Sequence, residues 1–551
     1  MDQPLKLDFN ERSDKVSPLA QDSKFDALWR YPVRQSLEQE IAALYDLEES
    51  QVLCTNGGDE AIMILMRIIK ECRQLILPLP AFSQYTWGVK SWQLDARLIA
   101  PKSDLSIDLA MTLNAIGQTS QSVTIITRPN NPTGELIALE DLLSILETAQ
   151  SNNGWVFLDE AYIEFSDSYF DQPAQLKSLL NQFENLVVLR TLSKAFGLAG
   201  IRLGYLLGSS RLVQEFELRC MPFNVPQPSL TIASQALAQS NRSEVKNYCQ
   251  TIAENRHKLT QWLTKLGIEV LPSQANFILL RLANNQARAV QSFLAKNNIL
   301  VRAFGESELG DCLRITIPYQ LNDIYPCLKQ ALAPELICLD MDGVLIDTSA
   351  SYEATILKTV ETLSGSRVKQ DDIERLKNSG GFNNDWLVSQ QLLSDNGVKL
   401  PLDRVIEVFQ SIYLGDNGDG LVSNETPMIA DSLIARCKAI RSCQFAVVTG
   451  RPRQEAIAGT RLIGLEALEI ISLDDVEQPK PSAEGIKKLQ NKFSKFSWMC
   501  GDNPDDMLAA NKSNSLAIGI GRQNAETLYQ AGADIVLDNI NELEAWLCPI
   551  Q

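Results

Sequence analysis

The chain has 551 residues, of which 45% are hydrophobic and 21% charged, and its net charge is −18. This length exceeds what one hydrophobic core usually organises, so we expect two or more domains. The acidic balance argues against partners such as nucleic acid or an anionic membrane surface. The single histidine, His257, excludes a multi-histidine metal site.

The sequence shows neither a secretory signal pattern nor an apolar run long enough to span a bilayer. Eleven scattered cysteines form no Cys-x-x-Cys pair, which is typical of reduced thiols. We therefore expect a cytoplasmic protein whose partners are small molecules.

Apolar stretches that resemble buried strands alternate with longer amphipathic stretches, a pattern that predicts an α/β fold throughout. Each early strand candidate leads into a polar segment, and ligands of open α/β sheets gather at such carboxyl ends. These candidates are residues 75–79, 123–127, 155–158 and 186–189. The proline-rich stretch 222–228 predicts a crossing into a smaller subdomain that also contains the N-terminal arm. A second domain is expected to begin near Pro334, before the apolar run 336–339.

Lys194 follows the strand candidate 186–189 in a segment rich in small residues, and Arg202 lies eight positions further on. A lysine amine at a strand end can condense with an aldehyde cofactor, while an arginine holds the phosphate of that cofactor. Asp159 follows the preceding strand, where a carboxylate would keep a pyridine nitrogen protonated. These positions predict a pyridoxal phosphate enzyme.

Further motifs share this order along the chain: Gly58-Asp59-Glu60 at a helix start, Tyr85, the run Asn130-Asn131-Pro132-Thr133-Gly134, and Tyr162. With them, residues 5–332 resemble the fold-type I (class I and II) aminotransferases, and within these the histidinol-phosphate aminotransferases. The resemblance implies a fold with a large α/β domain and a small α+β domain, and a dimer. It also implies a set of residues that bind pyridoxal 5′-phosphate: Gly58, Asp59, Glu60, Tyr85, Asn131, Asp159, Tyr162, Thr191, Ser193, Lys194, Arg202 and, from the neighbouring subunit, Tyr31.

Two arginines concern the substrate. The resemblance implies that Arg314 binds the substrate carboxylate, for which a planar guanidinium gives bidentate recognition. Arg302 matches a family position near the phosphate on the side chain of the substrate, although a lone arginine is more often a surface residue. The family's usual motifs are altered at Arg12 and at Arg128, and these departures leave the identity of the substrate open.

A second chemistry begins at Asp340-Met341-Asp342. Along an extended strand the period of two points both carboxylates the same way, as a nucleophile and its acid–base partner require. Further motifs follow in order at Thr449-Gly450, at Lys480 and at Asp502 with Asp506. Residues 335–551 thereby resemble the haloacid dehalogenase superfamily, specifically phosphatases with a helical cap (subfamily I) on a Rossmann-like domain.

That resemblance implies that Asp340 attacks phosphorus and that Asp342 protonates the leaving oxygen. Thr449, Gly450 and Lys480 would bind the phosphoryl group. Magnesium (Mg2+) would be held by four carboxylates: Asp340, Asp342, Asp502 and Asp506.

We therefore expect an aminotransferase in residues 1–333 and a hydrolase in residues 334–551. The aminotransferase would have a large domain at about 26–222 and a small domain formed by 1–25 and 223–333. The hydrolase would have a core at about 334–350 and 431–551, and a helical cap at about 351–430.

The fusion suggests a bifunctional enzyme of histidine biosynthesis, in which histidinol phosphate and 2-oxoglutarate or glutamate are the transamination substrates and the phosphatase acts on the same product. A general or aromatic aminotransferase joined to a phosphatase for an unrelated ester, such as a phosphoglycolate-like substrate, is the alternative. A third reading makes one half a non-catalytic module, which the complete sets of motif residues in both halves disfavour.

Overall fold

The computed structural model describes residues 4–14, 28–169, 174–305, 307–378, 384–415 and 419–547. Its contacts divide the chain into two compact units. The first, called the N-terminal unit, comprises residues 1–281 and 299–323, and the second, the C-terminal unit, comprises 282–298 and 324–551. No helix among the described residues is long and apolar enough to cross a membrane.

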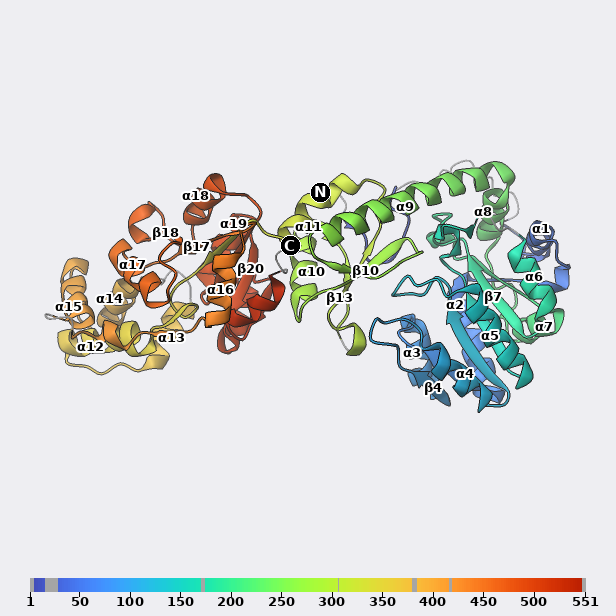
Figure 1. The fold of residues 1–551 in the computed structure, drawn as a ribbon, viewed down its shortest axis with the longest axis horizontal. Coiled ribbons are helices and arrows are strands. Elements are labelled where there is room, and N and C mark those ends of the chain that lie inside the picture. The colour runs from blue at the N-terminus through green and yellow to red at the C-terminus, as the bar shows by residue number, and fades with distance from the viewer. Residues whose placement is uncertain are drawn as a thin grey trace. The chain divides into compact units, whose positions relative to one another are not determined.

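The N-terminal unit is built on a seven-stranded sheet with helices on both faces (Figure 1). Its strand order is β2 (Val52–Thr55), β8 (Gly204–Gly208), β7 (Leu186–Thr191), β6 (Trp155–Asp159), β5 (Ser122–Thr127), β3 (Gln74–Pro78) and β4 (Ala96–Ile99). All pairs are parallel except those of β8, which runs antiparallel to both neighbours. The central strands are buried along their whole length because helices cover both faces.

Nine helices belong to the described part of this unit: α1 (Gln35–Tyr45), α2 (Gly57–Cys72), α3 (Ser83–Trp92), α4 (Leu109–Gly117), α5 (Leu139–Ser151), α6 (Gln175–Gln182), α7 (Ser210–Glu217), α8 (Gln227–Leu237) and α9 (Gln239–Lys265). Helix α2 shows why the sequence folds locally as it does. Asp59 and Glu60 lie in its first turn and Lys70 in its last, which suits the helix dipole. Its apolar face, including Leu65, packs against Phe157 and Val187 of the sheet.

A second, antiparallel sheet of this unit has the order β12 (Arg302–Ala303), β13 (Cys312–Thr316), β10 (Phe277–Arg281) and β9 (Glu269–Val270). The N-terminal strand β1 (Leu5–Lys6) pairs in parallel with β11 (Ile299–Leu300). The arm at residues 4–14 is thereby tied to the segment around β11. Single helical turns complete the unit: η2 (Glu49–Gln51), η3 (Ile163–Phe165), η5 (Ala199–Ile201), η6 (Ser307–Leu309) and η7 (Leu321–Asp323).

The C-terminal unit contains a six-stranded parallel sheet in the order β18 (Glu469–Ile471), β17 (Gln444–Val448), β14 (Leu336–Leu339), β19 (Ser497–Gly501), β20 (Leu516–Ile520) and β21 (Ile535–Leu537). Further helices of the unit are α16 (Asp431–Ala439), α17 (Arg453–Leu462), α18 (Glu484–Lys492), α19 (Pro504–Lys512) and α20 (Ala525–Gln530). Short turns are η8 (Ser349–Glu353), η9 (Leu421–Asn424), η10 (Leu473–Asp475), η11 (Arg522–Asn524) and η12 (Ile540–Trp546). The predicted α/β class is therefore confirmed in both units.

Among the described residues, four helices form an insertion between β14 and α16: α12 (Ala354–Ser364), α13 (Gln370–Asn378), α14 (Asp385–Asp395) and α15 (Leu402–Leu414). They have a hydrophobic core of their own, which includes Ile356, Leu392 and Phe409. The chain enters and leaves this helical insertion through a two-stranded antiparallel ribbon, β15 (Ile346–Asp347) and β16 (Thr426–Pro427). This arrangement is what a cap domain requires.

Two helices that the sequence assigns to the aminotransferase half group with the C-terminal unit. They are α10 (Gln286–Lys296) and α11 (Tyr325–Leu332). Lys296 forms an ion pair with the buried Asp534 at 2.8 Å, and the Trp498 indole donates to the Gln330 carbonyl at 2.6 Å. The compact units therefore interleave along the chain, whereas the predicted boundary at residues 333–334 is a single point in the sequence.

Candidate active sites

The N-terminal unit has a cavity of about 410 Å³ at the carboxyl ends of its central strands. Thr127, Asp159 and Thr191 come from the ends of β5, β6 and β7, and the parallel register brings these ends to one edge. Gly58 and Asp59, at the start of α2, form another part of the wall. The edge where the sequence predicts a ligand is thus a cavity.

Lys194 lies in this cavity just beyond β7, and its Nζ donates a hydrogen bond to the Phe9 carbonyl at 2.9 Å. Asp159 is buried opposite, where it accepts hydrogen bonds from the Tyr85 hydroxyl at 2.7 Å and the Ala161 amide at 3.0 Å. Burial raises the pKa of Asp159, and the Tyr85 hydrogen bond opposes that rise. A cationic group facing Asp159 would offset the cost of burying this carboxylate.

The start of α2 and Arg202 form a second recognition element of the cavity. Arg202 forms an ion pair with Asp59 and sits beside Gly57, which has a φ of +72°. A Cβ at position 57 would lie 2.6 Å from Arg202 Nη2, and the positive φ also favours glycine there. A helix N-terminus next to a guanidinium is suited to bind a phosphate.

Arg314, on β13, enters the cavity from the small subdomain. Its Nη1 donates to Asn131 Oδ1 and its Nη2 to the Asp8 carbonyl, both at 2.6 Å, while its buried Nε has no hydrogen-bond partner among the described atoms. Burial lowers the pKa of this guanidinium. Tyr162 accepts from Asn131 at 3.5 Å and from Asn10 at 3.2 Å. The arm thus forms part of the cavity wall.

Several predicted residues lie outside the cavity lining. Tyr85 is buried behind Asp159, and Phe82 of the same segment lines the cavity instead. Glu60 accepts from the amide of Asn56 and from Asn224, so it fixes the turn before α2.

Arg302 and Tyr31 are also absent from the lining of the cavity. Arg302 is exposed on β12 in register with Arg314. Tyr31 is 77% exposed and stacks on Phe223 with ring centroids 4.5 Å apart. Thr191 and Ser193 line the cavity with their hydroxyls 2.9 Å apart.

The C-terminal unit gathers its predicted residues at the carboxyl ends of β14, β17 and β19. Lys480 forms ion pairs with Asp340 at 2.8 Å and with Asp506 at 2.6 Å, and all three side chains are buried. One carboxylate oxygen each from Asp340, Asp502 and Asp506 lies within 4.8 Å of the others. Burial, with the charge of Asp506, raises the pKa of Asp340 and raises that of Asp502 to about 7.

Local structure explains this convergence. Asp506 caps its own helix by accepting from the Asn503 amide at 3.1 Å, which fixes its carboxylate at the start of α19. Gly343 has a φ of +68°, and a Cβ there would lie 2.0 Å from Asp502 Oδ2. The turn after Asp342 therefore needs glycine for two reasons. The backbone has a positive φ there, and a side chain would collide with Asp502.

Asp342 lies apart from the group of three carboxylates and is held by a residue that sequence reasoning missed. Arg451 donates to Asp342 Oδ1 from Nε at 2.8 Å and from Nη2 at 2.6 Å. The same guanidinium pairs with Glu425 at 3.0 Å, and Arg451 is only 2% exposed. Thr449 accepts from the Arg451 amide at 3.1 Å. Arg451 adjoins the Thr449-Gly450 motif, but Glu425 carries no sequence signal because it lies 26 residues away.

The helical insertion closes over this site. A small cavity of about 20 Å³ lies between the sheet and the insertion. It is lined by Asp342 and Gly450, which follow β14 and β17, and by Asn384 and Trp386 at the start of α14. Tyr352 donates to Glu455, and Gln410 of α15 donates to the same carboxylate at 2.9 Å. The insertion therefore forms part of the wall beside Asp342.

Both implied groups fit the residues present. The first cavity pairs an amine with a buried carboxylate and has a guanidinium beside a helix start, as pyridoxal phosphate requires. The second site has three buried or half-buried carboxylates and one lysine, and the surplus negative charge suits a divalent cation such as magnesium.

Comparison with known proteins gives a family match for each half of the chain. Residues 8–323 match the family model for class I and II aminotransferases, and residues 337–520 match that for haloacid dehalogenase-like hydrolases. Histidinol-phosphate aminotransferase of Thermoanaerobacter pseudethanolicus is 34% identical over 292 residues, which are 52% of this chain and 78% of that protein.

Two solved structures share the fold. Histidinol-phosphate aminotransferase from Clostridium acetobutylicum has a TM-score of 0.54 at 21% identity, and the match covers 59% of this chain and 97% of that chain. The enzyme from Sinorhizobium meliloti in complex with pyridoxal-5′-phosphate has a TM-score of 0.51 at 23% identity, covering 58% and 88%.

Proposed function

We propose that this chain, which belongs to the class I and II aminotransferase family and carries a haloacid dehalogenase-like hydrolase domain, is a bifunctional enzyme of histidine biosynthesis. Its first half would transaminate histidinol phosphate, or a similar phosphorylated amino compound, with 2-oxoglutarate or glutamate. Its second half would hydrolyse a phosphate monoester, with histidinol phosphate, which the first half forms when glutamate is the amino donor, as the preferred substrate. The names of the relatives support the first substrate, and the fusion supports the second.

The observation that carries the transamination is the convergence of Lys194, Asp159 and Arg314 on one cavity. Pyridoxal phosphate, when bound, supplies an aldehyde carbon and a ring that accepts electrons. Asp159 would hold a proton on the ring nitrogen, and Lys194 Nζ would move a proton at the substrate carbon. Arg314 would bind the substrate carboxylate.

Other residues of the same cavity would make the remaining contacts with the cofactor. Arg202 and the start of α2 at Gly58 would hold the cofactor phosphate. Asn131 and Tyr162 would hydrogen-bond the phenolic oxygen. Tyr31 would reach the cofactor of a neighbouring subunit, which makes the active form a homodimer.

In the hydrolase half, an Asp340 oxygen would form a bond to phosphorus while the bond to the leaving oxygen breaks, with Asp342 giving that oxygen its proton. Water would then attack the phosphoaspartate, lose a proton to Asp342 and release phosphate. Lys480 would neutralise the nucleophile and the phosphoryl group. A magnesium ion would be held by Asp340, Asp502 and Asp506 and would supply positive charge.

The first test follows the absorbance of the cofactor-loaded protein as histidinol phosphate is added without a keto acid, with phosphate release measured in the same cuvette in magnesium. The proposal expects conversion of the cofactor to its amine form together with release of phosphate. An unchanged spectrum that converts with an aromatic amino acid would replace the proposed substrate. Conversion without phosphate release would remove the link between the two reactions.

Two variants separate the halves. Lys194→Ala should abolish the absorbance band of the lysine-bound cofactor and leave phosphatase activity intact. Asp340→Asn should abolish phosphate release, by at least about a thousandfold as expected for loss of a nucleophile, while transamination stays unchanged. A Lys194→Ala protein that still shows the band would contradict the assignment of the lysine.

A further inference from the structure

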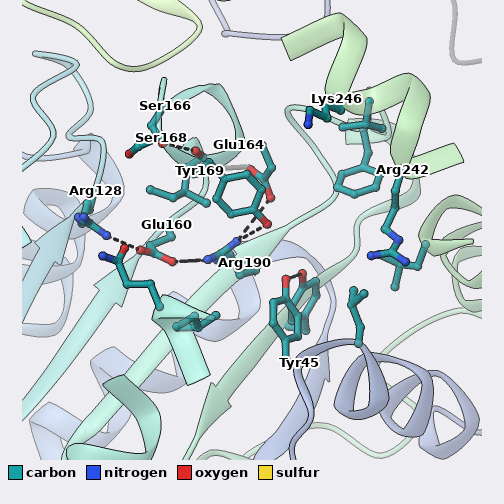
Figure 2. A pocket seen from close by; sticks show the side chains of 18 of the residues that line it. Tyr45, Arg128, Glu160, Glu164, Ser166, Ser168, Tyr169, Arg190, Arg242 and Lys246 are labelled. Carbon is teal, nitrogen blue, oxygen red and sulfur yellow. Dashed lines mark hydrogen bonds and ion pairs between the residues drawn. The ribbon is translucent and has the colours of Figure 1, made fainter. Parts of the chain in front are cut away.

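The N-terminal unit contains a second cavity, of about 280 Å³, which the proposed reactions do not use (Figure 2). It shares no described lining residue with the cofactor cavity. Three of its residues, Arg128, Glu160 and Arg190, each lie between two sequence neighbours that line the cofactor cavity. Successive side chains of extended backbone point to opposite sides, so the two cavities lie on opposite sides of the same strand ends.

One wall of this cavity is a buried ionic network with an unsatisfied acceptor. Arg190 donates to Glu160 at 2.9 Å and to the Tyr169 hydroxyl at 3.1 Å, and it reaches Glu164 Oε1 only at 3.8 Å. Glu164 Oε2 has no hydrogen-bond partner among the described atoms, although this residue is only 5% exposed. A buried acceptor without a donor is costly, which indicates that a donor is missing from this wall.

The opposite wall carries positive charge. Arg242 and Lys246 lie one turn apart at the start of α9 and line the cavity (Figure 2). Cations four residues apart repel each other, and the N-terminal turns of a helix also disfavour them. Arg242 Nε is buried without a hydrogen-bond partner, and Arg242 forms no ion pair within the described part of the chain. An anionic group at this wall would accept a hydrogen bond from Arg242 Nε.

The surface between these two charged walls is largely apolar, and its residues include Leu44, Leu176, Leu237 and Val245. The volume is close to the lower limit of small-molecule sites, about 300 Å³. We propose that this cavity binds a small zwitterion of the amino-acid class, with its cationic donor group on Glu164, its carboxylate at Arg242 and its carbon chain against the apolar wall.

The test is calorimetry on the cofactor-loaded full chain with 4-guanidinobutyrate and with 4-imidazoleacetate. Both probes carry a cationic donor and a carboxylate but no primary amine, so neither can condense with the cofactor aldehyde. Butylguanidinium and butyrate each keep one charged end only. We expect saturable binding of one zwitterion per chain, and affinity at least tenfold weaker for each single-ended probe.

Two variants and one control identify the site. Glu164→Gln and Arg242→Gln should each weaken binding at least tenfold while both variants stay folded and keep the cofactor spectrum of the parent. Glu254→Gln removes the same charge from an exposed position further along α9 and should bind as the parent does. Absence of saturable heat with both zwitterions would overturn the proposal, as would parental affinity in both cavity variants or displacement of the cofactor by the probe.

Discussion

Replacing Glu164 with glutamine should stabilise the N-terminal unit in a pH-dependent way. Burial raises the pKa of Glu164 from its usual 4.5 to about 7, and Glu160 adds to the rise while Arg190 opposes it. Between these pH values the folded chain holds a proton that the unfolded chain has lost. Stability therefore falls as pH increases through this window, and the stabilising contribution present below pH 4.5 is gone above pH 7.

The magnitude follows from the same two pKa values. Each tenfold change in proton affinity is worth about 1.4 kcal/mol, so the wild-type carboxylate costs the folded unit about 3 kcal/mol at pH 8. Glutamine resembles the protonated acid in shape and is neutral at every pH. Glu164→Gln should thus change the free energy of unfolding little at pH 4.5 and increase it by up to about 3 kcal/mol at pH 8.

The assay is hydrogen exchange with mass spectrometry in increasing urea, read on peptides from β6 and β7, because these strands report on the N-terminal unit alone. The control is Glu254→Gln, whose carboxylate is exposed on α9 and should show no pH-dependent difference. Equal stabilities of Glu164→Gln and the parent at pH 8 would refute the reasoning, because the carboxylate would then not be destabilised by its burial.

Two further predictions concern the hydrolase half. Arg451→Met removes the cationic partner of the buried Glu425 and frees Asp342. We expect a loss of about 3–5 kcal/mol in stability, measured by urea unfolding, and slower phosphate release. The double variant Arg451→Met with Glu425→Leu should recover most of the stability but not the activity, and a double variant as unstable as the single one would contradict the ion-pair account. Gly343→Ala should cost about 1–3 kcal/mol in stability, because the residue has a positive φ, and it should displace Asp502. The magnesium concentration needed for half-maximal phosphatase activity should therefore rise at least tenfold. An unchanged magnesium requirement would show that this glycine does not affect the metal site.

The α/β class of the fold, and the general place of each site, could be predicted from the sequence because strand periodicity and motif order are local properties. Lys194 and Asp159 follow apolar strands, and parallel strands necessarily bring their carboxyl ends to one edge. Asp340 directly follows β14, so its place at the same edge of the second sheet could be predicted for the same reason.

Side-chain partners over long sequence distances were decided by tertiary structure. Glu425 meets Arg451 only because the helical insertion returns to the sheet beside β15, and nothing near Glu425 in the sequence announces that. Tyr85 is placed behind Asp159 rather than in the cavity lining because α3 packs against the sheet core. Packing of this kind depends on how all neighbouring side chains fill space, which no local pattern specifies.

The sequence by itself therefore determined the two chemistries, since residue type and local spacing fix which groups stand at a strand end. Only the tertiary structure decided how the chain is shared between compact units, with α10 and α11 joining the C-terminal unit through contacts such as that of Lys296 with Asp534. It also decided that Arg128, Glu160 and Arg190 enclose a second cavity, because the packing of α6 and α9 leaves that space beside the strand ends unfilled.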